Sequence, residues 1–214
     1  MNKKIVVSIL IFILLIVGLL IGFTFFGSKN DTNINNNENN GNSGSINDST
    51  NNDTSNKIGT KVAVIYFSAT GNTKKVASYI NEEVNGTLIE IEASDSYTAD
   101  DLNYNNSNSR CNIEHNDDKT RPGIKNKIDI SSYDTIYLGY PIWWNDAPRI
   151  IYTFLDTYDL TNKRVILFAT AASSSIENSM NNLKNYQKNV NFVTGKRLGV
   201  SKTEVSNWIK DLNS

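Results

Sequence analysis

Hydroxyl side chains and one glycine gather at a predicted turn between a strand and a helix. The turn reads Ser68-Ala69-Thr70-Gly71-Asn72-Thr73 and lies between a strand-like run, 61–67, and a helix-like run, 74–84. The first turn of a helix exposes backbone N–H groups and carries partial positive charge, so it can hold a phosphate without a charged side chain. We therefore predict a phosphate-binding loop made by Ser68, Thr70, Gly71, Asn72 and Thr73.

Two common nucleotide-binding loops do not fit this turn. It lacks the Gly-Lys-Ser/Thr end of a triphosphatase loop and the GxGxxG pattern of a dinucleotide loop. On its own the turn also has a simpler explanation, because Ser and Thr before a helix serve as ordinary N-caps. Its interpretation depends on what lies beside it.

Two further loops also follow strand-like runs. One reads Pro141-Ile142-Trp143-Trp144-Asn145-Asp146 and the other Thr170-Ala171-Ala172-Ser173-Ser174-Ser175. Neighbouring side chains in an extended segment point opposite ways, so at least one indole should be exposed, where it can stack on a planar ring. The small residues of the other loop leave room for a ring edge. A phosphate at one end and a planar ring at the other describe flavin mononucleotide (FMN), although a Trp pair alone is more often part of a core.

Strand-like and helix-like runs alternate from residue 61 to residue 212. The expected strands are 61–67, 87–92, 135–140, 164–168 and 190–193, and the expected helices are 74–84, 148–158, 176–186 and 201–212. Nearly continuous apolar strands indicate burial on both faces of a parallel sheet. The pattern predicts an α/β fold in which helices cover both faces of that sheet and ligands bind at the carboxyl ends of the strands.

The stretch 93–132 is long, irregular and rich in Asn and Asp. We expect a short helix over 97–104, with Leu102 pointing inward. His115, the only histidine, titrates near neutrality and could donate a proton, but without a partner at a suitable spacing we favour a structural role. Cys111 is the only cysteine, so no intramolecular disulfide forms, and no Cys/His cluster predicts a metal site.

The N-terminal segment, 1–27, predicts a membrane anchor. Ile5 to Phe26 is an uncharged, largely apolar run that would span about 33 Å as a helix, enough to cross a bilayer. A cleaved signal peptide is the alternative, but the run is longer than usual and lacks a small-residue cleavage site. Lys3 and Lys4 favour an inside N-terminus, so the following domain should face outside the cytoplasm, or be secreted if the segment is cleaved.

Residues 28–58 predict a disordered linker, and residues 59–214 a single domain. Twelve of the 30 residues from Ser28 to Lys57 are Asn, and such a segment cannot bury enough apolar surface to fold. The domain carries 17 Lys and Arg against 18 Asp and Glu, which leaves a net charge of −1. Near-neutrality argues against nucleic acid as a partner, because binding to its phosphates needs concentrated positive charge.

The motifs together resemble the flavodoxin family. The matching residues are Tyr66 to Thr73, Gly139 to Trp144 and Asp146 to Arg149, followed by a helix through Leu155. The chain looks closest to a branch with a Tyr-Pro-x-Trp-Trp loop, often secreted or anchored in bacteria. The resemblance implies a doubly wound five-stranded parallel sheet of order 2-1-3-4-5 and non-covalent FMN.

The resemblance also implies a role for each loop. Ser68, Thr70, Asn72 and Thr73 would hold the phosphate, Trp143 or Trp144 would flank the flavin ring, and the third loop would meet the pyrimidine edge of that ring. The complete set of expected cofactor-binding residues is Ser68, Thr70, Gly71, Asn72, Thr73, Pro141, Trp143, Trp144, Asn145, Thr170, Ala171, Ala172 and Ser173.

The chain departs from the family pattern in three respects. Asn145 stands where relatives usually have Gly, the third loop contains no glycine, and the domain is not acidic. We interpret the protein as an FMN-binding electron-transfer protein that serves a redox protein or a small-molecule acceptor. An FMN-dependent NAD(P)H:quinone-type reductase and a flavodoxin-fold binding module that has lost FMN stay open as alternatives.

Overall fold

The computed structural model describes residues 61–214, so the expected anchor and linker lie outside the described residues. The strands are β1 (Val62–Tyr66), β2 (Thr87–Glu90), β3 (Thr135–Pro141), β4 (Arg164–Thr170) and β5 (Asn191–Arg197). The helices are α2 (Asn72–Val84), α3 (Arg110–Asn116), α4 (Arg149–Thr157), α5 (Glu177–Tyr186) and α6 (Lys202–Asn213). Within this part of the chain, no helix combines the length and apolar character needed to cross a membrane.

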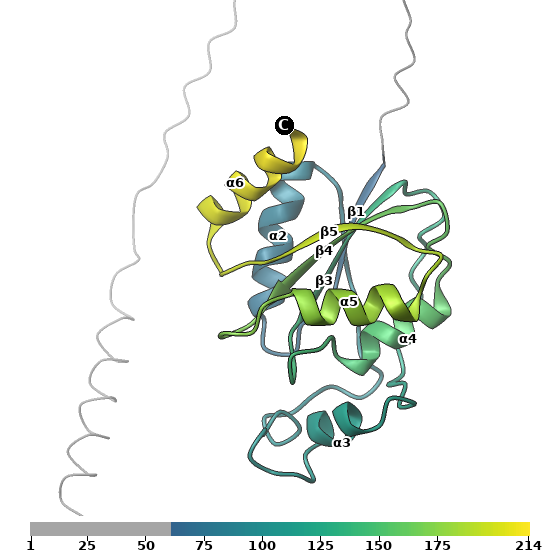
Figure 1. Ribbon diagram of the computed structural model, residues 1–214, viewed down its shortest axis with the longest axis vertical. Coiled ribbons are helices and arrows are strands. Elements are labelled where there is room, and N and C mark those ends of the chain that lie inside the picture. Colours follow the sequence, from purple (N-terminus) through teal and green to yellow (C-terminus); the bar gives the residue numbers. More distant parts are fainter. Residues whose placement is uncertain (1–60) are drawn as a thin grey trace, which may run out of the picture. The chain divides into compact units, whose positions relative to one another are not determined.

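The five strands form one parallel sheet in the order β2-β1-β3-β4-β5 (Figure 1). This order confirms the doubly wound topology that the family resemblance implies. The chain moves outward from β1 to β2 and then crosses back to β3 on the other side of β1. The loops after β1 and β3 therefore diverge, and such a divergence opens a crevice at the carboxyl ends of the strands.

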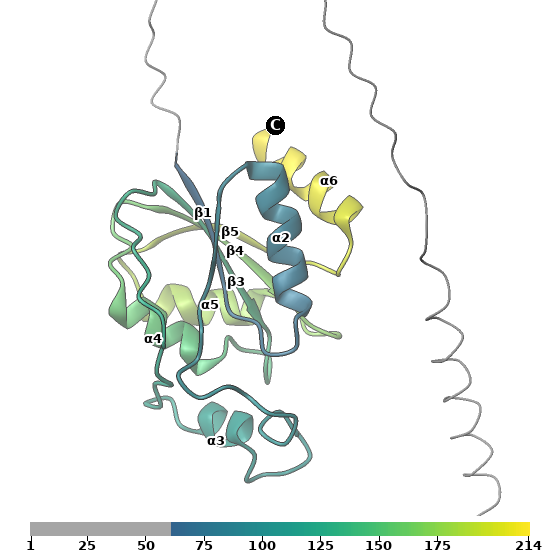
Figure 2. The same cartoon turned by 180° about the vertical axis from the view of Figure 1, so that it is seen from behind.

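Helices cover both faces of the sheet, as the views from the two sides show (Figures 1 and 2). α2 and α6 pack on one face through side chains such as Val76, Ile80 and Trp208, and α4 and α5 pack on the other. Successive β1 residues alternate between these two cores, because side chains along a strand point to opposite faces. Trp208 is 5% exposed and belongs to this core.

The helix predicted over 97–104 is wrong. That segment forms turns, and the helix of this region is α3, at Arg110–Asn116. The carboxylate of Asp101 accepts hydrogen bonds from the backbone N–H and the hydroxyl of Thr98, and Asn103 and Asn106 side chains accept from nearby backbone N–H groups. Short polar side chains that bond the local backbone compete with a helix, and here they close turns instead.

β5 extends four residues beyond the predicted end at 193. Its apolar run stops there, but Thr194 to Arg197 continue to pair with β4. A strand at the edge of a sheet needs fewer apolar residues because it is partly open to solvent, and β5 is accordingly less buried than β3 or β4.

Candidate functional site

A cavity of about 870 Å³ opens at the carboxyl ends of the strands. This volume falls within the range of about 300–1,000 Å³ typical of small-molecule sites. All three loops singled out in the sequence contribute to its wall. The lining residues are Thr70, Asn72, Leu102, Tyr104, Pro141, Ile142, Trp143, Trp144, Asn145, Thr170, Ala171, Ala172, Ser173, Ser174, Leu198, Gly199 and Val200.

Ten of the thirteen expected cofactor-binding residues line this cavity, and Ser68, Gly71 and Thr73 do not. These three residues instead stabilise the conformation of the first loop. The Ser68 hydroxyl accepts a hydrogen bond from Gly71 N at 3.1 Å. The buried hydroxyl of Thr73 lies 2.8 Å from that of Thr170, which ties the start of α2 to the loop after β4.

The first turn of α2 has no side chain capping it. Gly71 is the N-cap residue, and its φ of 89° is one that glycine adopts without strain. The first turn also contains no acidic residue, so nothing in the helix itself competes for its exposed N–H groups. Lys74, the nearest cation, pairs with Glu90 at 2.9 Å. The geometry fits an anion held by neutral backbone donors at this end of the cavity.

The loop after β3 is a tight hairpin. Trp143 and Asp146 exchange two backbone hydrogen bonds of 2.9 Å, and the two residues between them have positive φ, 49° at Trp144 and 61° at Asn145. Positive φ at both central positions is the signature of a type I′ turn. Asn tolerates this conformation, whereas a Trp in it is uncommon and points to a local constraint.

The hairpin separates the two tryptophans. Trp143 is 7% exposed and packs edge-on against Phe67 and Tyr97, whereas Trp144 is 46% exposed. The expectation that at least one indole is exposed is therefore confirmed. Of the two, Trp144 is the one available to stack on a planar ligand in the cavity.

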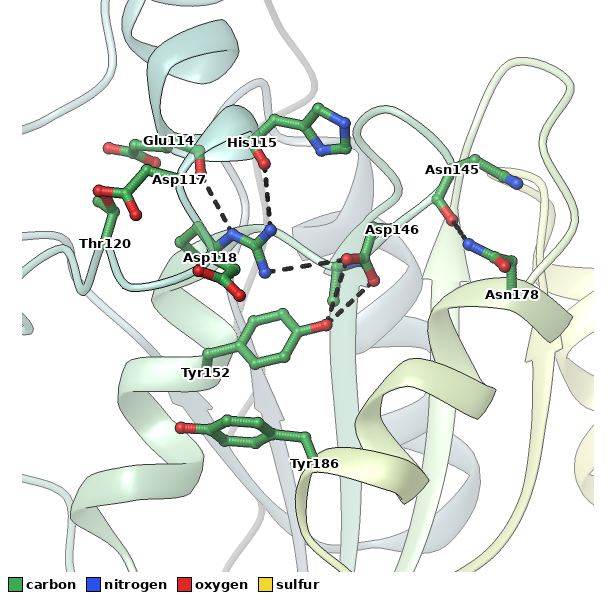
Figure 3. A network of polar contacts seen from close by, with 12 residues as sticks. Glu114, His115, Asp117, Asp118, Thr120, Asn145, Asp146, Tyr152, Asn178 and Tyr186 are labelled. Carbon is green, nitrogen blue, oxygen red and sulfur yellow. Dashed lines mark hydrogen bonds and ion pairs between the residues drawn. The ribbon is translucent and has the colours of Figure 1, made fainter.

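A buried polar network holds the hairpin on α4 (Figure 3). The Asp146 carboxylate accepts hydrogen bonds from Ala147 N at 2.8 Å and the Tyr152 hydroxyl at 3.1 Å, and it lies 3.9 Å from Arg149. Burial and the nearby Asp146 charge both raise the pKa of Tyr152, so this hydroxyl remains a donor at physiological pH. Asn178 of α5 donates a hydrogen bond to the Asn145 carbonyl at 2.8 Å.

Two segments of the wall were missed by sequence reasoning. Leu102 and Tyr104 come from the turns before α3, and Leu198 to Val200 from the connection between β5 and α6. The Tyr104 ring meets the Trp144 ring edge-on, with 5.4 Å between their centroids. The only sequence signal for Tyr104 was that it is an aromatic residue in a long, irregular segment. The β5–α6 connection could have been found from its place at the carboxyl end of a strand.

No charged side chain lines the cavity among the residues that the structure describes. Carboxylates stand at the starts of two of the three helices that follow its other loops. Glu177 lies in the first turn of α5, and Glu204 lies in the first turn of α6. Glu204 also accepts a hydrogen bond from Gly199 N at 3.0 Å, and its own backbone N–H donates to the Ser201 hydroxyl, which caps α6. The cavity therefore favours an anion at α2 and disfavours one at the starts of α5 and α6.

The other residues noted in the sequence lie outside the cavity. His115 is at the end of α3, where its ring faces Trp144, and Cys111 is a free thiol that is 1% exposed. Within residues 61–214, no group of three His, Cys, Asp or Glu side chains is placed to hold a metal ion.

Comparison with known proteins identifies relatives of the whole described domain. A family model described as Flavodoxin matches residues 61–212. A protein classed as a flavoprotein from Bacteroides eggerthii is 40% identical, with a TM-score of 0.69 and coverage of 73% of this chain and 99% of that one. A similar protein from Bacteroides uniformis is 45% identical, with a TM-score of 0.69 and coverage of 71% and 99%.

A third similar structure is a flavoprotein from Lactobacillus acidophilus in complex with FMN. It is 29% identical, with a TM-score of 0.55 and coverage of 71% of this chain and 99% of that one. No protein of curated function matches the chain. All three similar structures consist almost entirely of the part that matches this chain.

The positive φ at Asn145 predicts opposite effects for two substitutions. Asn145→Val should lower the free energy of unfolding by about 1–3 kcal/mol, because a β-branched side chain is strained at positive φ. Asn145→Gly should leave it unchanged or raise it slightly, because glycine adopts this conformation freely. Urea unfolding of residues 59–214 measures both. Equal stability of the two variants would mean that the hairpin is not held in this conformation in solution.

Proposed function

This chain belongs to the flavodoxin family, and from that premise we propose that residues 59–214 bind FMN non-covalently and transfer electrons. The observation that carries the proposal is the cavity with an uncapped helix start at one end and an exposed indole at the other. It lies where the loops after β1 and β3 diverge, and flavodoxins are a known example of ligand binding at this point.

The phosphate end of the cavity fits FMN through neutral donors. Thr70 and Asn72 line the cavity at the start of α2, where backbone N–H groups face a bound anion. Gly71 gives the loop its left-handed turn, and a Cβ there would meet no atom within 4 Å. Glycine is thus required at this position by the backbone conformation, not by crowding.

The ring end of the cavity fits a flat aromatic group. Trp144 presents an exposed indole, and Ala171 and Ala172 form the side contributed by the loop after β4. The Cβ atoms of these alanines, which replace glycines common in the family, leave the cavity open at about 870 Å³. The alanines at these two positions are therefore compatible with FMN binding.

The cofactor would supply one- and two-electron chemistry, and the chain would tune it. A charge-free lining offers no salt bridge to negative charge on the ring, which favours a low reduction potential. Trp144 would shield one ring face from water. The electron-transfer partner is a redox protein or a small-molecule acceptor.

Titration of purified residues 59–214 with FMN tests the proposal. We expect a shifted visible spectrum and quenched flavin fluorescence, because an indole stacked on the ring changes both. Trp144→Ala should raise the Kd for FMN by about 5- to 150-fold, since aromatic stacking contributes about 1–3 kcal/mol. Trp208→Phe is the matched control, because Trp208 packs against Tyr137 in the core on the opposite face of the sheet. Absence of flavin binding by the unsubstituted domain would refute the function.

The uncharged lining of the described cavity supports electron transfer over the reductase alternative. A nicotinamide dinucleotide brings a second set of phosphates, and the described cavity has no charged lining residue to receive them. Glu177 and Glu204, at the starts of α5 and α6, would repel such anions.

We therefore expect FMN-loaded residues 59–214 to oxidise NADH and NADPH no faster than free FMN does. Absorbance at the nicotinamide band measures the rate, and reduction by dithionite serves as the positive control. Steady oxidation well above the free-FMN rate would instead favour the NAD(P)H:quinone-type reductase. Failure to bind FMN would favour a binding module that has lost its cofactor.

We also propose that the protein is held in the cell membrane by a single N-terminal span, with the FMN-binding domain outside the cytoplasm. The uncharged run from Ile5 to Phe26 and the preceding Lys3 and Lys4 support this arrangement. Fractionation should place the full chain in membranes, and protease added to intact cells whose outer surface is accessible should remove the domain. A domain that is protected until the cells are lysed would contradict the orientation.

A further inference from the structure

The single histidine of the chain stacks on the exposed tryptophan of the cavity. The His115 and Trp144 rings lie with their centroids 5.8 Å apart and their planes 26° from parallel. Trp144 lines the cavity, whereas His115 comes from α3 and does not line it. The imidazole and the cavity therefore both border the same indole.

Arg149 fixes the end of α3 beside the hairpin. Its guanidinium donates hydrogen bonds of 3.1 Å to the backbone carbonyls of Glu114 and His115, and it also faces the Asp146 carboxylate (Figure 3). The helix that carries His115 and the hairpin that carries Trp144 are thus joined through one cation. Because Arg149 holds both segments, the stack of His115 on Trp144 is a defined contact between α3 and the hairpin.

Charged and titratable groups surround His115 on several sides. Arg149 of α4 and Asp146 of the hairpin act on it in opposite directions. Burial, followed by the positive charge of Arg149, lowers the pKa of His115, and Asp146 opposes this change. On the same helix, Glu114 is engaged by Arg110 and Tyr97, and the Cys111 thiol is buried.

The remaining titratable neighbours do not take up or release a proton near pH 6. Tyr104, which contacts the same indole, has a pKa raised to about 12, mainly by burial. Asp117, just after α3, has its pKa lowered by a backbone hydrogen bond from Lys119. Among these groups around Trp144, His115 is the one whose ordinary pKa lies between pH 5 and pH 8.

We propose that His115 is a positioning residue for FMN: in its uncharged form it packs behind Trp144 and holds the indole in place, and protonation of the imidazole weakens this hold. The inference rests on the proposed function and adds a pH-dependent control of the same site. Protonation places a second cation beside Arg149, in a partly buried place where their repulsion is poorly screened.

The direction of the effect follows from linkage. The pKa of His115, lowered by burial and by Arg149, means that this place in the folded domain favours the neutral imidazole over the protonated one. The stabilisation is complete above the ordinary histidine pKa of about 6.5 and is lost as the pH falls through the lowered value. The affinity for the ring stacked on Trp144 should therefore decrease as the pH falls from about 7.5 to about 5.

The phosphate of FMN itself gains a proton near pH 6, so FMN alone cannot isolate the histidine. Riboflavin has the same ring without the phosphate and serves as the second probe. For residues 59–214, we expect the riboflavin Kd to rise several-fold between pH 7.5 and 5, because protonated His115 holds the indole less well. His115→Phe keeps a planar ring behind the indole but cannot be protonated, so its riboflavin Kd should be independent of pH over this range.

Ile113→His in the His115→Phe background is the matched control. Ile113 is 54% exposed on the same helix, so this change restores a histidine to α3 without restoring the stack on Trp144. The double variant should stay independent of pH. A restored pH dependence would mean that any nearby positive charge suffices and would overturn the role of the stack.

An NMR titration of the unsubstituted domain provides a readout that needs no flavin. Because the chain has one histidine, its imidazole signal reports His115 directly, and it should titrate below pH 6.5. An ordinary or raised pKa, or an equal pH dependence of riboflavin binding in His115→Phe, would overturn the inference while leaving FMN binding intact. If the domain bound neither FMN nor riboflavin at pH 7.5, the proposed function would fail, and this inference with it.

Discussion

The backbone turn between Trp143 and Asp146 is the constraint on which the site depends. Two reciprocal hydrogen bonds close it, and both of its central residues have positive φ. This geometry sends one indole into the core and leaves the other at the edge of the cavity. The cost of placing a tryptophan at positive φ is offset by the ties that hold the turn, from the buried Asp146 carboxylate to Tyr152 of α4 and from Asn178 of α5. Because these four hydrogen bonds hold the turn, the Trp144 side chain that it carries is well suited to define one wall of a binding site.

The second organising feature is the handling of charge. The described cavity has a neutral lining, and the start of α2 has neither a side-chain cap nor an acidic residue, so backbone dipoles there can replace a salt bridge. Acidic residues at the starts of α5 and α6 leave those helices unsuited to anions. A ligand with one phosphate and a large uncharged ring satisfies this distribution. The charges that do approach the site, Arg149 and Asp146, bind each other and the backbone behind Trp144 and do not line the cavity.

Much of the architecture could be predicted because it depends on local sequence patterns. Uncharged apolar runs such as 135–140 identified the inner strands. The loops after β1, β3 and β4 could be assigned to one site because the carboxyl ends of parallel strands meet at one edge. The turns before α3 could not be predicted. There, bonds between Asn or Asp side chains and the backbone compete closely with a helix, and the outcome depends on contacts distant in sequence.

The fold class, the order of the elements and ten residues of the cavity wall could be inferred from residue patterns, because periodicity and turn chemistry act over short stretches of chain. The exposure of Trp144, the contact of the Thr73 hydroxyl with Thr170, and the contacts of Tyr104 and His115 with Trp144 emerged only in the folded domain. Those outcomes depend on where α3 and α4 pack, and packing is decided by the whole core together. A residue pattern can state which chemistry is available at a site, but distances between loops separated by tens of residues arise only when the chain has folded.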